Sequence, residues 1–107
     1  HTRVLRYWDH TLPVSAQTPL AYGYGQAWDS TDIATGVCIS TETGTAHGTT
    51  VAGAGSGNGL ANGQNKGMAP DSKIIIVETN FNLPNWSLTV ADACDYIFKV
   101  AVIIFFK

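Results

Sequence analysis

The chain has 107 residues, an apolar content of 45% and a formal net charge of −2. This length fits one domain at most, and the charged fraction of 13% is about half the level usual in soluble proteins. The six Lys and Arg residues are scattered, so no basic patch favours nucleic acid or an anionic membrane surface as a partner. The apolar tail from Val100 to Phe106 is too short to span a membrane, which takes about 20 residues.

The first part of the chain, residues 1–43, is predicted to be loop-rich with one good strand. Arg3–Trp8 has the branched and aromatic residues of a strand, which ends at Asp9-His10-Thr11. The composition of Leu12–Gly25 is typical of an ordered surface loop, broken by Pro13 and Pro19.

A short helical turn follows that loop. The polar residues from Asp29 to Asp32 are N-cap candidates for this turn, and Gly36 is expected to end it. Val37–Ile39 is predicted to be a brief extended piece, followed by a polar loop at Ser40–Thr45.

Residues 44–107 are predicted to alternate between helix and strand. A helix of small residues follows His47, and the unbroken apolar run within Lys73–Thr79 is typical of a parallel strand covered on both faces. Glycine-rich turns separate the two, and Asn80–Asn85 is a loop. This order of elements predicts an α/β fold with a mostly parallel sheet.

A final amphipathic helix is predicted with Ser87 as its N-cap. Asp92 and Asp95 should lie on the side opposite its apolar face, and the stretch after Val100 fits either more helix or a new strand. The apolar positions expected to share one face are Leu88, Ala91, Ala93, Cys94, Ile97, Phe98 and Ala101.

Simple cofactor motifs are absent from the sequence. Neither a dinucleotide-binding nor a Walker glycine pattern fits the glycine run, and His1, His10 and His47 lack metal-ligand spacing. Carboxylates and carbonyls could still hold calcium. Cys38 and Cys94 are expected to be free, partly buried thiols, with a disulfide between them as the alternative.

His47 is the candidate catalytic residue. A histidine at the start of a helix is well placed to act as a general base, although a lone histidine is more often a surface or core residue. Here it opens His47-Gly-Thr-Thr-Val-Ala-Gly, and Gly67-Met-Ala-Pro-Asp-Ser-Lys later leads into the apolar strand. This pair of motifs, in this order, resembles the histidine signature and following strand entry of subtilisin-like serine proteases.

The resemblance extends over most of the chain and is closest to a bacterial subgroup. The segments Arg3–Asp9 and Tyr22–Gly25 resemble an insertion of subtilases that include the clostridial germination proteases and Bacteroidetes relatives, and Asp92–Phe98 resembles a helix of that subgroup. Ala46 and Thr50 depart from the family pattern, at positions that do not transfer the proton. On this basis residues 1–107 would be an internal segment of one catalytic domain, with 1–43 as insertion and 44–107 as histidine helix, core strand and following helix.

The resemblance implies a serine endopeptidase with an Asp-His-Ser triad in a three-layer subtilisin-type fold, and His47 as its general base. Asp29-Ser30-Thr31 lacks both the glycine and the preceding strand of the family's aspartate motif, Asp9 would belong to the insertion, and no Gly-Thr-Ser motif is present. This chain alone is therefore expected to be inactive. Its partners would be a protein or peptide substrate and the remainder of the catalytic domain.

Further expectations come only from the family. The chemistry needs no cofactor, a structural calcium ion is an open question, and a secreted or cell-envelope location would be usual. Two alternatives stand beside the enzyme. One is a non-catalytic subtilase homologue that binds a partner or regulates it, and the other is an unrelated α/β binding module that contains His-Gly-Thr by chance.

Overall fold

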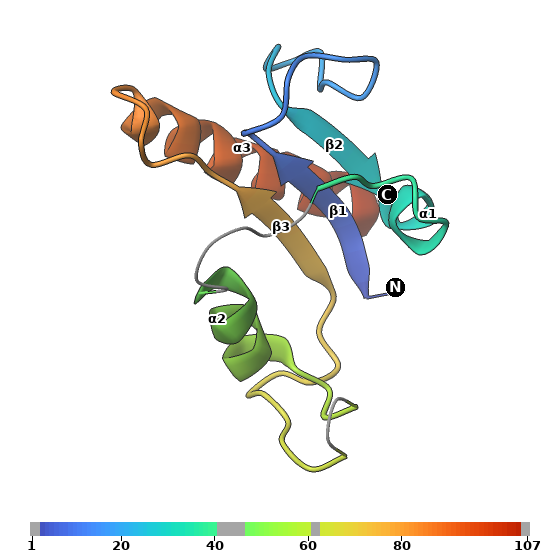
Figure 1. Ribbon diagram of the computed structural model, residues 1–107. Coiled ribbons are helices and arrows are strands. Elements are labelled where there is room, and N and C mark those ends of the chain that lie inside the picture. Colours follow the sequence, from blue (N-terminus) through green and yellow to red (C-terminus); the bar gives the residue numbers. More distant parts are fainter. Residues whose placement is uncertain (1–2, 41–46, 61–62, 106–107) are drawn as a thin grey trace.

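The computed structural model describes residues 3–40, 47–60 and 63–105 (Figure 1). These residues form a mixed α/β structure with a small three-stranded sheet. The elements in chain order are β1 (Val4–Asp9), β2 (Gln26–Asp29), α1 (Ser30–Ala34), α2 (His47–Ser56), β3 (Ile74–Glu78) and α3 (Trp86–Phe105).

The strand β1 is the centre of the sheet, whose order is β2-β1-β3. It pairs with β3 in parallel, from Val4 opposite Ile74 to Asp9 opposite Glu78, with one irregularity in register between Val4 and Arg6. It pairs with β2 antiparallel. The predicted parallel pairing therefore holds for β1 and β3, whereas the sheet as a whole is mixed.

Residues 1–43 contain more regular structure than the sequence predicts. The strand β2 was not predicted, since it has only four residues and follows a loop with no apolar run. The expected turn is present as α1, where Asp29 and Asp32 form a reciprocal capping box and Gly36 ends the turn at φ +79°. Val37–Ile39, predicted to be a brief extended piece, belongs to neither a helix nor a strand of the sheet.

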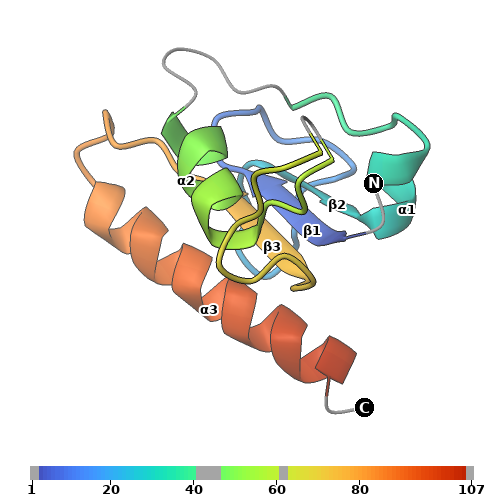
Figure 2. The same cartoon turned by 90° about the horizontal axis from the view of Figure 1, so that it is seen from below.

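The two longer helices lie on opposite sides of the sheet (Figure 2). In Figure 1, α3 lies behind the strands, and the segment that follows α1 crosses in front of β1. The residues of β3 are half-buried throughout, because only β1 pairs with it among the described residues. The prediction that this strand is fully covered on both faces is therefore wrong for this chain.

The core is small and aromatic, and it lies between the sheet and α3. The Trp8 side chain is completely buried, and its ring packs 5.0 Å from that of Tyr96 and 4.7 Å from that of Tyr22. The Trp8 indole N–H also donates to the carbonyl oxygen of Tyr24 at 3.1 Å. This bond satisfies the one polar atom of a residue that otherwise contributes apolar area.

The orientation of α3 differs from the sequence prediction. Its buried residues are Thr89, Ala93, Tyr96 and Val100, at helical spacing. Most of the predicted apolar face is exposed instead. The side of α3 that carries Tyr96 faces the sheet, where the Tyr96 ring packs against those of Trp8 and Tyr22. The helix also begins at Trp86, so Ser87 is not its N-cap, and it continues to Phe105, which answers the question left open after Val100.

The outward face of α3 leaves a row of apolar side chains in water. Leu88, Phe98, Val102 and Ile103 are each more than half exposed. Despite this apolar row, α3 does not qualify as a membrane span, and neither does any other helix in the described part of the chain. The row and the half-buried β3 are two apolar surfaces that this fold leaves uncovered.

We predict that the 107-residue chain, produced alone, self-associates through these uncovered surfaces. The change Phe98→Lys should reduce association measured by sedimentation velocity, because it places a charge within the row. The matched control is Leu20→Lys, on a loop side chain that is 99% exposed and outside the row. A cooperative thermal melt of the isolated chain as a monomer would contradict this prediction.

Candidate functional site

His47 is the first residue of α2, as the sequence predicts for the candidate base. Residues 41–46, which precede it, lie outside the described residues, and so does the direction of its side chain. The small residues that follow do not pack α2 tightly onto the sheet, since Gly48–Gly55 are exposed.

Backbone carbonyl oxygens at the end of α2 instead accept hydrogen bonds from the second sequence motif. The backbone N–H of Gly67 donates to Gly57 O at 2.8 Å, that of Met68 to Ala54 O at 3.1 Å, and that of Ala69 to Gly55 O at 2.7 Å. These bonds satisfy carbonyls at the end of α2 that have no partner within the helix. The second motif is thus joined by backbone hydrogen bonds to the residues that directly follow the first motif.

Gly67 is required for this contact on steric grounds. A Cβ atom at this position would lie 2.7 Å from Gly53 O and 2.7 Å from the backbone nitrogen of Gly57, which is closer than real Cβ contacts. One further bond, from Ser72 Oγ to Ser56 Oγ at 3.0 Å, ties the strand entry to the end of α2. The position of the helix that starts at His47 is therefore coupled to the chain entering β3.

We predict that Gly67→Ala destabilises α2 by about 1–3 kcal/mol, because the new methyl group must push the helix backbone away. Gly53→Ala is the matched control, since a Cβ there meets nothing within 4 Å and alanine favours a helix by about 1 kcal/mol. Hydrogen exchange of the α2 amides measures both changes. Equal protection in the two variants would show that the close contact does not hold α2.

A polar cluster lies where the parallel strands β1 and β3 end. Its members are Tyr7 and Asp9 of β1, Glu78 of β3, and Ser40. Ser40 Oγ lies 2.5 Å from Asp9 Oδ2 and 3.3 Å from Glu78 Oε2, so one hydroxyl stands between two carboxylates. Tyr7 donates its hydroxyl proton to Glu78 Oε2 at 2.9 Å. The carboxyl ends of parallel strands are common positions for functional groups in α/β proteins.

The electrostatics of the cluster keep its tyrosine protonated. Burial raises the pKa of Tyr7 to about 12, the Ser40 hydrogen bond opposes this, and the Glu78 carboxylate adds to the rise. Tyr7 is therefore a proton donor at neutral pH. Asp9 is 2% exposed, and its Oδ1 accepts from Thr11 N at 2.8 Å and Thr11 Oγ1 at 2.6 Å. Both oxygens of Asp9 thus have partners within the cluster.

Asp29 and Asp9, the two aspartates compared above with the aspartate of the family's triad, occupy different positions. Asp29 is exposed and caps α1 by accepting from Asp32 N at 2.9 Å, so its carboxylate has a structural role. A short strand, β2, ends at Asp29, but its sequence Gln-Ala-Trp-Asp is not the apolar strand that precedes the family's aspartate. Asp9 is buried at the carboxyl end of the central strand, and its short contact with Ser40 was not predicted. The only sequence signal for the cluster is the pair of predicted strands, Arg3–Trp8 and Lys73–Thr79, whose carboxyl ends lie at or next to Asp9 and Glu78.

We predict that Ser40→Ala lowers the free energy of unfolding by about 1–3 kcal/mol, because it leaves a buried carboxylate oxygen without its donor. Ser87→Ala, at an exposed position in the first turn of α3, is the matched control and should change stability little. Urea denaturation curves measure both. A loss of stability no larger for Ser40→Ala than for Ser87→Ala would mean that Asp9 does not depend on this hydroxyl.

Metal-ligating side chains do not converge in the described part of the chain, where no group of three or more His, Cys, Asp or Glu could hold an ion. Cys38 is a half-buried free thiol and Cys94 an exposed one, so the disulfide alternative does not form.

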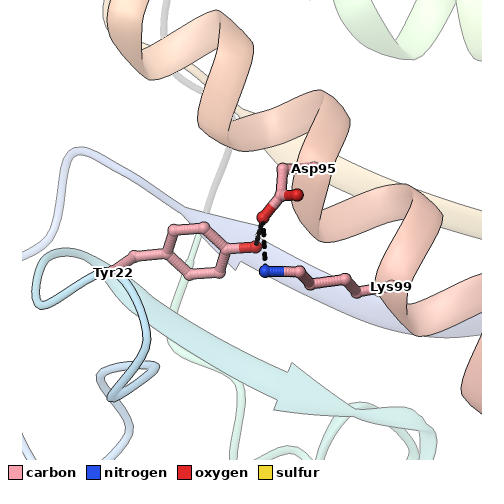
Figure 3. Close-up of polar contacts among 3 residues, drawn as sticks. All are labelled: Tyr22, Asp95 and Lys99. Carbon is pink, nitrogen blue, oxygen red and sulfur yellow. Dashed lines mark hydrogen bonds and ion pairs between the residues drawn. The ribbon is translucent and has the colours of Figure 1, made fainter.

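A second polar contact region joins the loop before β2 to α3. Tyr24 donates to Asp92 Oδ2 at 2.7 Å, and Tyr22 donates to Asp95 Oδ2 at 2.5 Å. Lys99 pairs with the same Asp95 oxygen at 2.9 Å, as Figure 3 shows. Asp92 and Asp95 therefore face the loop, which corrects the prediction that they point away from the packed side of the helix. The exposed Lys99–Asp95 ion pair is expected to contribute little to stability by itself.

The chain matches no known protein-family model, no curated protein and no solved structure.

Proposed function

We propose that this chain is a segment of the catalytic domain of a subtilisin-like serine endopeptidase. The intact enzyme would hydrolyse peptide bonds of a protein or peptide substrate through an acyl-enzyme. His47 would act as its general base, taking the serine proton and later returning it to the leaving amine. The subtilisin-type three-layer arrangement is part of the same proposal.

The observation that carries the proposal is the contact between the two motifs. The resemblance rests on the helix that begins at His47 and on Gly67-Met-Ala-Pro before the strand, which are separate in the sequence. The backbone of Gly67–Ala69 hydrogen-bonds to α2, and the chain then enters β3. Gly67 of the second motif is required at this contact, because a Cβ atom there would lie 2.7 Å from Gly53 O of the first motif. A chance match to His-Gly-Thr would not by itself place the second motif against the helix that begins at His47.

The remaining catalytic groups would come from other parts of the polypeptide. Peptide hydrolysis by this route needs a serine nucleophile, a carboxylate that orients the imidazole and donors for the oxyanion. Asp9 is not assigned to the orienting role, since its oxygens are bonded to Thr11 and Ser40. The uncovered face of α3 and the half-buried β3 fit a segment that packs against the remainder of such a domain. A secreted or cell-envelope location belongs to this proposal by resemblance alone.

Labelling of the intact protein with a serine-directed fluorophosphonate tests the proposal. His47→Ala should slow labelling by about 10²–10⁴-fold, because the general base no longer activates the serine. Val51→Ala is the matched control, one turn along the same helix at a side chain that is 57% exposed, and it should label normally.

Three outcomes separate the possibilities. Labelling that is lost only in His47→Ala supports the enzyme and the role of His47. Undiminished labelling in His47→Ala would remove the histidine from that role. No labelling of the unaltered protein would contradict the enzyme and favour the non-catalytic homologue, in which the fold binds a partner.

A further inference from the structure

His10 has an unusual environment, on the opposite face of the sheet from the Asp9 cluster. Its side chain is 7% exposed, and neither ring nitrogen has a hydrogen-bond partner among the described residues. The ring centroid lies 4.1 Å from that of Trp8, edge to face, and 5.0 Å from that of Tyr24. A buried imidazole without hydrogen-bond partners costs free energy. The aromatic layer formed by His10, Trp8 and Tyr24 therefore stabilises the His10 ring in its neutral state only.

The groups around His10 come from every element packed there. Asp9 precedes it on β1, Tyr22 and Tyr24 belong to the loop before β2, and α3 contributes Asp92, with Asp95 one turn further along. From β3, the backbone oxygen of Glu78 accepts the His10 backbone N–H at 2.9 Å, while the Glu78 carboxylate bonds to Tyr7 on the other face.

Asp92 connects His10 to the docking of α3. Its carboxylate accepts the Tyr24 hydroxyl, and this contact ties α3 to the loop before β2. Asp92 is also the largest source of negative charge acting on His10. An imidazolium at His10 would be attracted to this carboxylate, because a charged donor forms the stronger hydrogen bond. Movement of the ring toward Asp92 would take it past Tyr24, against which it packs, and would disturb the Tyr24–Asp92 contact.

We propose that His10 is an acid-sensitive latch: when its ring gains a proton, it leaves the aromatic layer for Asp92, the Tyr24–Asp92 bond breaks, and α3 loosens from the sheet. The device needs no ligand and is independent of the proposed protease chemistry. Trp8, against which both His10 and Tyr96 pack, transmits the change to α3.

The direction of the pH effect follows from the burial. Burial lowers the pKa of His10 below its ordinary value of 6.5, and the charges of Asp92 and Asp9 oppose part of this. The unfolded or undocked state therefore binds the proton first. The contribution of neutral His10 to the docked state is complete above pH 6.5. It is lost as the pH falls below that value, toward the lower pKa that His10 has in the docked state.

Hydrogen exchange of the intact protein, resolved to α3 peptides and corrected for the intrinsic effect of pH, tests the latch. Between about pH 7.5 and about pH 5, protection of the α3 amides should fall about tenfold, with a smaller change in β3. In His10→Phe, which keeps an aromatic ring but cannot be protonated, this pH dependence should disappear.

A second variant keeps the test decisive if His10→Phe does not fold. Asp92→Asn removes the carboxylate that receives the imidazolium, so loosening of α3 should move to lower pH. Protection of α3 that does not change with pH in the unaltered protein would overturn the proposal. So would a pH dependence that persists in a folded His10→Phe variant or stays at the same pH in Asp92→Asn.

Discussion

The parallel pairing of β1 with β3 is the constraint on which the other contacts depend. It joins strands about 70 residues apart in the sequence, from Val4 opposite Ile74 to Asp9 opposite Glu78. Closing such a long loop costs entropy that only the contacts it creates can offset. One result is the Asp9–Ser40–Glu78 cluster at the strand ends, and the other is the flat surface that receives Tyr96 of α3. Because β1 is central, a change in its register would move both faces at once.

Several elements could be predicted from local sequence alone. The strand β1, the capped turn α1, the helix that begins at His47 and the strand β3 each follow from residue type and spacing. In these segments the local signal is strong: a run of Ile and Val in β3, a polar cap directly before α1, and a glycine with positive φ directly after that turn. The α/β class follows from their order.

Other features depend on contacts that no local pattern contains. The strand β2 has four residues and exists because β1 offers it a partner. The buried side of α3 is decided by contacts with Trp8 and with the two tyrosines before β2. Because these tyrosines donate hydrogen bonds to Asp92 and Asp95, the acidic residues lie beside the packed face. The Ser40–Asp9 contact joins a loop residue to a strand end, and nothing in either segment indicates the other. The proposed role of His47 rests on resemblance, whereas the surroundings of Asp9 and His10 required the structure.

The hydrogen bond from Gly67 N to Gly57 O has a consequence for how the chain can vary in length. Together with the isolated bridge between Asn58 and Lys66, it closes the intervening loop at its base. The entropic cost of closing such a loop grows only slowly with the number of residues in it. Residues could therefore be inserted between Asn58 and Lys66 without moving either α2 or the entry to β3. A tag or a foreign peptide inserted in this loop would therefore be displayed with little effect on the two motifs.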